Sequence, residues 1–168
     1  MQRTYPVPHE KIAKRRRRHD VCVVKLSNLL RQNGYATNRT PNYAGDLYAV
    51  KSDEVIIIEV KPLHPGSLNM QPIIHGVGQL IYYSYLFNKT PESKTRSLKL
   101  WLAFPYNEKI FKEYYYGERN YLDDLKSRAE PYLNQFKISL VPVEMMENEF
   151  YDPAFIEFLS SQEMSALG

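Results

Sequence analysis

Asp46, Glu59 and Lys61 are charged residues in a stretch that is otherwise rich in apolar, β-forming side chains. Residues 55–60 read Val-Ile-Ile-Ile-Glu-Val, a nearly continuous apolar run that is typical of a strand buried on both faces of a sheet. Glu59 and Lys61 are two positions apart, so their side chains lie on the same side of an extended strand. A carboxylate and an ammonium group at the end of a buried strand indicate chemistry rather than packing.

The residues before this strand predict its partner. The segment 45–61 has two apolar, β-rich parts joined by the polar connection 51–54, which is the pattern of an antiparallel hairpin. A turn centred between Ser52 and Asp53 pairs Asp46 directly with Glu59. Side chains paired in this way have Cβ atoms roughly 4.5–5.5 Å apart. The two carboxylates are therefore expected to share one small site.

Two carboxylates this close repel each other, and one of them holds a proton unless a cation neutralises the pair. Hard divalent ions such as Mg²⁺ bind through one or two carboxylates together with phosphate oxygens and water. Because Lys61 adds a positive charge on the same face, the set predicts phosphodiester cleavage with Mg²⁺ or Mn²⁺. The alternative is structural: Asp46 ends a strand, and Glu59 and Lys61 form a solvated ion pair on an edge strand.

The pair Gly45-Asp46, followed by Glu59-Val60-Lys61, resembles the signature of the PD-(D/E)XK nuclease superfamily, with Gly45 in place of its proline. The resemblance implies that Asp46, Glu59 and the carbonyl of Val60 bind Mg²⁺ or Mn²⁺. It also implies that Lys61 is catalytic, because the lysine of this superfamily helps to activate water or stabilise the phosphate.

Gln79 and Tyr83 extend this resemblance, because they match the Gln-x-x-x-Tyr pattern of RecB-like nucleases and share one face of a helix. The resemblance spans roughly residues 9–104. It implies a metal-dependent DNA nuclease, with RecB-like end-processing or exonuclease activity. The small size and the Gly-Asp hairpin also resemble archaeal Holliday-junction resolvases, which implies as an alternative a structure-specific endonuclease acting as a homodimer. A non-catalytic DNA-binding protein that kept the fold is a further alternative.

The first helix is expected from about His9 to Asn33, with Gly34 ending it. Residues 1–39 hold ten Lys or Arg against two Asp or Glu, so this end carries +8 while the remainder of the chain carries −5. The densest run is expected to bind DNA phosphates without reading bases, unless it is a solvated face or a nuclear import signal. This run consists of Lys14, Arg15, Arg16, Arg17 and Arg18.

The resemblance also implies an acidic residue or a histidine on the first helix that faces the metal ion. Asp20 and His19 are the candidates, and Glu10 is a weaker one. His64 and His75 remain unassigned.

These elements predict a single α/β domain with the αβββαβ core of the restriction-endonuclease-like fold, a mixed central sheet flanked by helices. Residues 1–8 are expected to form an extended arm, 9–143 the core, and 144–168 an acidic C-terminal helix and tail. Beyond the hairpin, we expect strands at 35–39, 98–104 and 137–143, and helices that end near 87 and 136.

The composition is that of an ordinary globular protein, with 43% hydrophobic and 24% charged residues in 168. No run approaches the ~18 apolar residues of a membrane span, and no signal-peptide core follows the basic N-terminus. We therefore expect an intracellular protein, cytoplasmic or, in a eukaryote, nuclear, with no membrane partner. Cys22 is the only cysteine, which excludes an intrachain disulfide and a cysteine-rich metal site.

Overall fold

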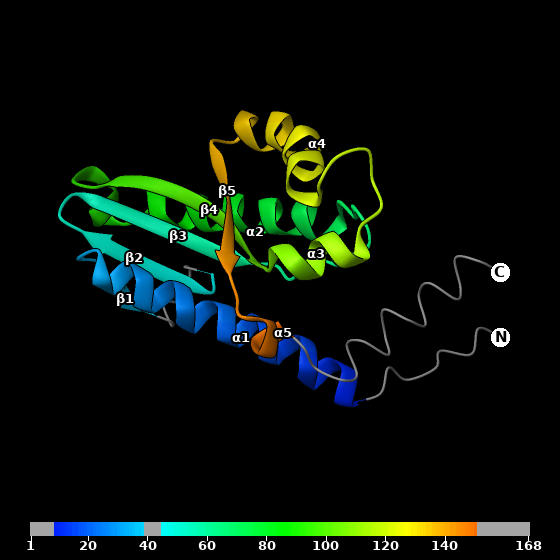
Figure 1. Ribbon diagram of the computed structural model, residues 1–168. Coiled ribbons are helices and arrows are strands. Elements are labelled where there is room, and N and C mark those ends of the chain that lie inside the picture. The colour runs from blue at the N-terminus through cyan, green and yellow to red at the C-terminus, as the bar shows by residue number, and fades with distance from the viewer. Residues whose placement is uncertain (1–8, 39–44, 151–168) are drawn as a thin grey trace, which may run out of the picture.

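The central strand of the sheet is β3 (Glu54–Val60), and every residue of it after Glu54 is buried. The structure, a computed structural model, describes residues 9–38 and 45–150. Its mixed sheet has antiparallel pairing from β1 to β3 and parallel pairing from β3 to β5 (Figure 1). The order of the five strands is β1 (Ala36–Asn38), β2 (Leu47–Lys51), β3, β4 (Ser97–Tyr106) and β5 (Ile138–Glu144).

Two long helices cover the sheet from opposite faces (Figure 1). α1 (His9–Gln32) ends before Gly34, whose φ of +88° is the left-handed conformation predicted for that residue. α2 (Gln71–Asn88) packs on β3 and β4. A Cβ on Gly76 would lie 2.4 Å from Leu102 Cδ1, so the missing side chain lets α2 approach β4 closely.

Four shorter helices complete the described part of the chain. They are η1 (Pro91–Lys94), α3 (Glu108–Tyr114), α4 (Tyr121–Gln135) and α5 (Glu147–Phe150). α4 packs on β5, and the Asn120 side chain caps it by accepting a hydrogen bond from the Asp123 N–H. The protein is thus an α/β protein with a mixed sheet flanked by helices.

The predicted hairpin register is confirmed, because Leu47 pairs with Ile58 and Lys51 with Glu54. The predicted end of the fourth strand was wrong, since β4 continues through Pro105 to Tyr106. β3 ends opposite Ala103, so Pro105 lies beyond it and removes no hydrogen bond from that side. α3 was not predicted from the sequence.

The segment after β5 packs on α1. Glu149 accepts a hydrogen bond from the Lys25 ammonium at 2.7 Å, and Phe150 is completely buried beside Phe111. The predicted arm at 1–8 and most of the acidic tail, residues 151–168, lie outside the described residues. Within the described ranges, the helices are too short or too polar to cross a membrane.

Candidate active site

Asp46 lies at the open end of the β2–β3 hairpin, one residue before β2 begins. Gly45 precedes it with a φ of +64°, a left-handed conformation that glycine adopts without strain. The Asp46 N–H donates to the Ile58 carbonyl at 3.1 Å, and Asp46 Oδ2 accepts a hydrogen bond from the Val60 N–H at 2.8 Å. These two bonds fix the Asp46 carboxylate beside the end of β3.

Glu59 is the buried neighbour of Asp46, and only 5% of the residue is exposed. Its Oε2 is buried without a hydrogen-bond partner. A Cβ on Gly45 would lie 2.8 Å from that oxygen, so the glycine leaves room for the carboxylate. Burial and the negative charge of Asp46 together raise the pKa of Glu59 to about 7, against the lowering effect of Lys61.

Lys61 is adjacent to this pair, with its Nζ 3.7 Å from Glu59 Oε1. The Lys61 N–H donates to the Ala103 carbonyl at 2.9 Å, which anchors the residue to β4 just after β3 ends. Its side chain extends past α2, because a Cβ on Gly76 would lie 3.3 Å from Lys61 Cγ. The ammonium group is therefore held near the carboxylates without forming a close ion pair.

α2 brings Gln79 and Tyr83 to the same site. A Cβ on Gly45 would lie 3.2 Å from Tyr83 Cε2, which places that ring against the hairpin end. Burial raises the pKa of Tyr83, and the negative charges of Glu59 and Asp46 add to the increase. Gln79 is one turn earlier on this helix face, and its buried Oε1 has no hydrogen-bond partner.

α1 contributes His19, whose Nε2 lies 3.0 Å from Asp46 Oδ2. This hydrogen bond, together with a 3.1 Å contact between Asp20 and Nδ1, raises the pKa of His19 to about 9 against the opposing effect of burial. Burial favours a higher pKa for Asp46, but the hydrogen bonds from His19 and the Val60 N–H lower it below its ordinary value. Asp20 contacts His19 and is largely exposed, so it acts on Asp46 only through the imidazole.

The basic run does not present all of its side chains to the surface. Arg17 is exposed, whereas Arg18 is only 7% exposed, with its guanidinium carbon 5.7 Å from the centre of the Phe150 ring. Placing Arg18 in a surface phosphate grip was therefore wrong, because α5 covers it. The side chains of Lys14, Arg15 and Arg16 lie outside the described part of the structure, although their backbone continues α1.

The residues at the hairpin end fit a hard divalent cation. Within the described residues, no group of three or more His, Cys, Asp and Glu side chains is arranged to hold a metal ion. Mg²⁺ does not need such a group, because one or two carboxylates suffice when water and phosphate oxygens complete the coordination. One oxygen of this carboxylate pair, Glu59 Oε2, is buried without a hydrogen-bond partner.

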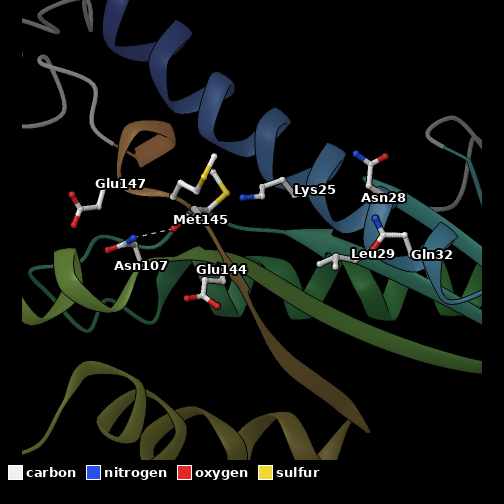
Figure 2. Close-up of a pocket in the computed structure, with 9 residues that line it drawn as sticks. Lys25, Asn28, Leu29, Gln32, Asn107, Glu144, Met145 and Glu147 are labelled. Carbon is white, nitrogen blue, oxygen red and sulfur yellow. Dashed lines mark hydrogen bonds between the residues drawn. The ribbon is translucent and has the colours of Figure 1, made fainter.

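A separate hollow of about 720 Å³ lies between α1 and the segment linking β5 to α5 (Figure 2). Asn107 donates to the Met145 carbonyl at 2.9 Å at one side of it, and Lys25 lies at another. None of the residues at the hairpin end lines this hollow. It is therefore not part of the candidate active site.

Gly45 departs from the motif by replacing its proline, and Gly76 lies inside α2. In the structure, Gly45 provides space for Glu59, and Gly76 lets α2 pack beside Lys61. The positions of these two glycines in the sequence could have indicated their roles. Gly45 directly precedes Asp46 at the hairpin end, and Gly76 precedes Gln79 by three residues.

No protein-family model matches this chain, and no curated protein matches its sequence. Its structure is similar to the crystal structure of AF1548, a protein of unknown function, with a TM-score of 0.44 and 14% sequence identity. The match covers 74% of this chain and 58% of the other. A likeness this distant does not show what the protein does, so the proposal below depends on the geometry of the site.

Proposed function

We propose that this protein is a metal-dependent deoxyribonuclease with a restriction-endonuclease-like fold. The observation that carries the proposal is the buried Glu59 carboxylate beside the partly exposed Asp46 carboxylate, with Lys61 next to Glu59, at the end of a central strand. Burying a carboxylate next to a like charge costs stability, and a fold that needed only packing would place an apolar side chain there. The order α1, β1, β2, β3, α2 and β4, which follows the αβββαβ pattern apart from the short η1 before β4, supports the proposed fold.

Asp46, Glu59 and the Val60 carbonyl would hold Mg²⁺ or Mn²⁺. When bound, the ion would supply positive charge for the attack of water on phosphorus and for the charge that develops on the phosphate oxygens. The Lys61 ammonium can donate a hydrogen bond to a phosphate oxygen, because its contact with Glu59 at 3.7 Å is too long to engage it fully. His19 orients Asp46 through Oδ2, the oxygen that also accepts from the Val60 N–H.

Gln79 and Tyr83 favour end-processing or exonuclease activity of the RecB-like type within this proposal. Both lie on the face of α2 that borders the carboxylates, and Gln79 Oε1 is available to a water or to a ligand in the site. Arg17 is the one member of the basic run whose side chain is described as exposed, so it is the member that DNA phosphates can reach in the described structure.

The test is to incubate the purified protein with linear, circular and four-way DNA in Mg²⁺, Mn²⁺ or EDTA. We expect cleavage of linear DNA that requires a divalent ion, starts from free ends and is lost in Asp46→Asn. The control is Asp53→Asn, which changes an exposed aspartate in the hairpin turn.

Two other outcomes distinguish the alternatives. Paired cuts in four-way DNA, with circular DNA also cleaved, would show a structure-specific endonuclease. DNA binding without cleavage, unchanged in Asp46→Asn, would show a non-catalytic protein and would overturn the proposal.

A further inference from the structure

α2 has a third face that touches neither the sheet nor the candidate site. The helix spans 18 residues without a single Asp, Glu, Lys or Arg. Its outward face is mostly apolar, and four large side chains on it are between two fifths and three fifths exposed. These are Ile74 (44%), Ile81 (41%), Tyr82 (57%) and Tyr85 (54%).

Gly78 lies in the middle of this face, and its surroundings differ from those of Gly76. A Cβ on Gly76 would meet Leu102 and Lys61, so packing within the chain explains that glycine. A Cβ on Gly78 would have nothing within 4 Å. A glycine inside a helix costs about 1 kcal/mol relative to alanine. Nothing within the described residues offsets that cost, so packing inside the described part of the chain does not explain this glycine.

We propose that a second copy of this chain packs on the outward face of α2, with a two-fold axis at Gly78. In an antiparallel helix pair about that axis, Ile74 of one copy faces Tyr82 of the second copy, and the reverse contact follows by symmetry. Glycine at the crossing point lets the two helix axes approach closely. We call the set Ile74, Gly78, Ile81, Tyr82 and Tyr85 the α2 stripe.

The absence of charge on α2 favours a second copy over nucleic acid. An uncharged stripe faces its own copy without like-charge repulsion, whereas DNA binding depends on cations that neutralise phosphates. Lys89, one residue past the helix, places its ammonium group over the Tyr85 ring, with Nζ 4.3 Å from the ring centre. That position is at one end of the stripe and leaves its centre apolar.

The size of the stripe predicts a weak dimer. A fully buried aromatic side chain covers about 150–250 Å², so the two half-exposed tyrosines and two isoleucines offer roughly 400 Å² in each copy. Interfaces of about 800 Å² in total are at the low end of specific association. We therefore expect a dissociation constant in the micromolar range. This inference does not depend on nuclease activity, because the oligomeric state is measured without substrate.

The first experiment measures mass by sedimentation equilibrium, with the full chain at up to about 100 µM, above the dissociation constant expected for so small an interface. We expect a monomer–dimer equilibrium in which Tyr82→Glu raises the dissociation constant about tenfold or more. Gly78→Gln should weaken the dimer similarly while leaving the monomer folded, because its Cβ enters open space. The matched control is Leu29→Glu, which removes an apolar side chain of similar exposure (49%) from α1 and should change nothing.

The second experiment introduces a reactive cysteine at the proposed two-fold axis, because the single native cysteine is buried. Burial raises the pKa of Cys22 to about 12, so Gly78→Cys adds the only reactive thiol. Mild oxidation should link Gly78→Cys into covalent dimers, whereas Asn134→Cys on α4 should form no disulfide-linked dimer.

Three results would overturn the proposal. One is a monomer across the whole concentration range. Another is a dimer that neither Tyr82→Glu nor Gly78→Gln affects. The third is an unchanged monomer in which Tyr82→Glu weakens binding of single-stranded DNA, which would assign the tyrosines to base stacking.

Discussion

The two ends of the β2–β3 hairpin hold the same residue types in opposite environments. At the turn, Glu54 accepts a hydrogen bond from the Lys99 ammonium at 2.9 Å and from the Tyr35 hydroxyl at 3.3 Å. The Lys99 contact lowers the pKa of Glu54. At the open end, burial beside Asp46 raises the pKa of Glu59 to about 7. Two glutamates on one strand therefore have pKa values shifted in opposite directions.

The difference shows that residue type alone does not define a site. At the turn, the Lys99 cation is close to its carboxylate and both are open to solvent. At the open end, the Asp46 carboxylate lies beside Glu59, and the Lys61 ammonium is 3.7 Å from Glu59. The Glu54 carboxylate is satisfied by close hydrogen bonds from neighbouring side chains, whereas Glu59 Oε2 is buried without a hydrogen-bond partner.

Cleavage activity should separate the two glutamates most strongly. Glu59→Gln should lower the rate of Mg²⁺-dependent DNA cleavage by on the order of 10³-fold or more, because it removes a charged ligand at the reacting centre. Glu54→Gln should retain the activity of the unaltered chain. Single-turnover cleavage of end-labelled linear DNA measures both rates. Equal losses of activity in the two variants would show that Glu59 has no special role in cleavage compared with Glu54.

Glycine substitutions should show that the open end is crowded around Glu59. Gly45→Ala should cost about 2–4 kcal/mol, because the left-handed conformation alone costs ~1–2 kcal/mol and the new Cβ meets both Glu59 Oε2 and the Ile58 carbonyl. Gly34→Ala is the matched control, since it has a similar φ but its Cβ meets only the flexible side chain of Lys51 at 3.4 Å. Urea unfolding measures both values. A smaller cost at Gly45 than at Gly34 would contradict the crowding.

Stability in EDTA should increase when Glu59 loses its charge. A carboxyl group whose pKa is raised on folding stabilises the protein below its unfolded pKa, and this stability is lost as pH rises through the folded value of about 7. Glu59→Gln should therefore be more stable than the unaltered chain by about 1–3 kcal/mol at pH 8 and by much less near pH 5.

Thermal unfolding with and without Mg²⁺ completes this test. Mg²⁺ should raise the unfolding temperature of the unaltered chain and not that of Glu59→Gln, because an ion that binds only the folded state stabilises it. Glu54→Gln should show the smallest effect, a slight loss of stability that disappears in high salt, because its ion pair is near the surface. If Mg²⁺ stabilises Glu59→Gln as much as the unaltered chain, the ion binds elsewhere.

Several features followed from the sequence because they depend on neighbours along the chain. The polar turn at 51–54 fixed the register in which Leu47 pairs with Ile58, and Gly34 marked the end of α1. The spacing of Gln79 and Tyr83 placed both on one side of α2. In contrast, α3 was not predicted, and the predicted strand ended before Pro105 although β4 continues to Tyr106, because residues 104–106 are paired with β5, which is distant in the chain.

The sequence by itself determined that two carboxylates and a lysine meet at the end of a buried strand, because a hairpin's register depends on its own turn and on alternation along its strands. Only the tertiary structure decided what surrounds them. α1 crosses the sheet so that His19 reaches Asp46, and α5 covers Arg18 with Phe150. Such contacts join elements that are distant in the chain, and their geometry depends on the packing of the whole core rather than on local spacing.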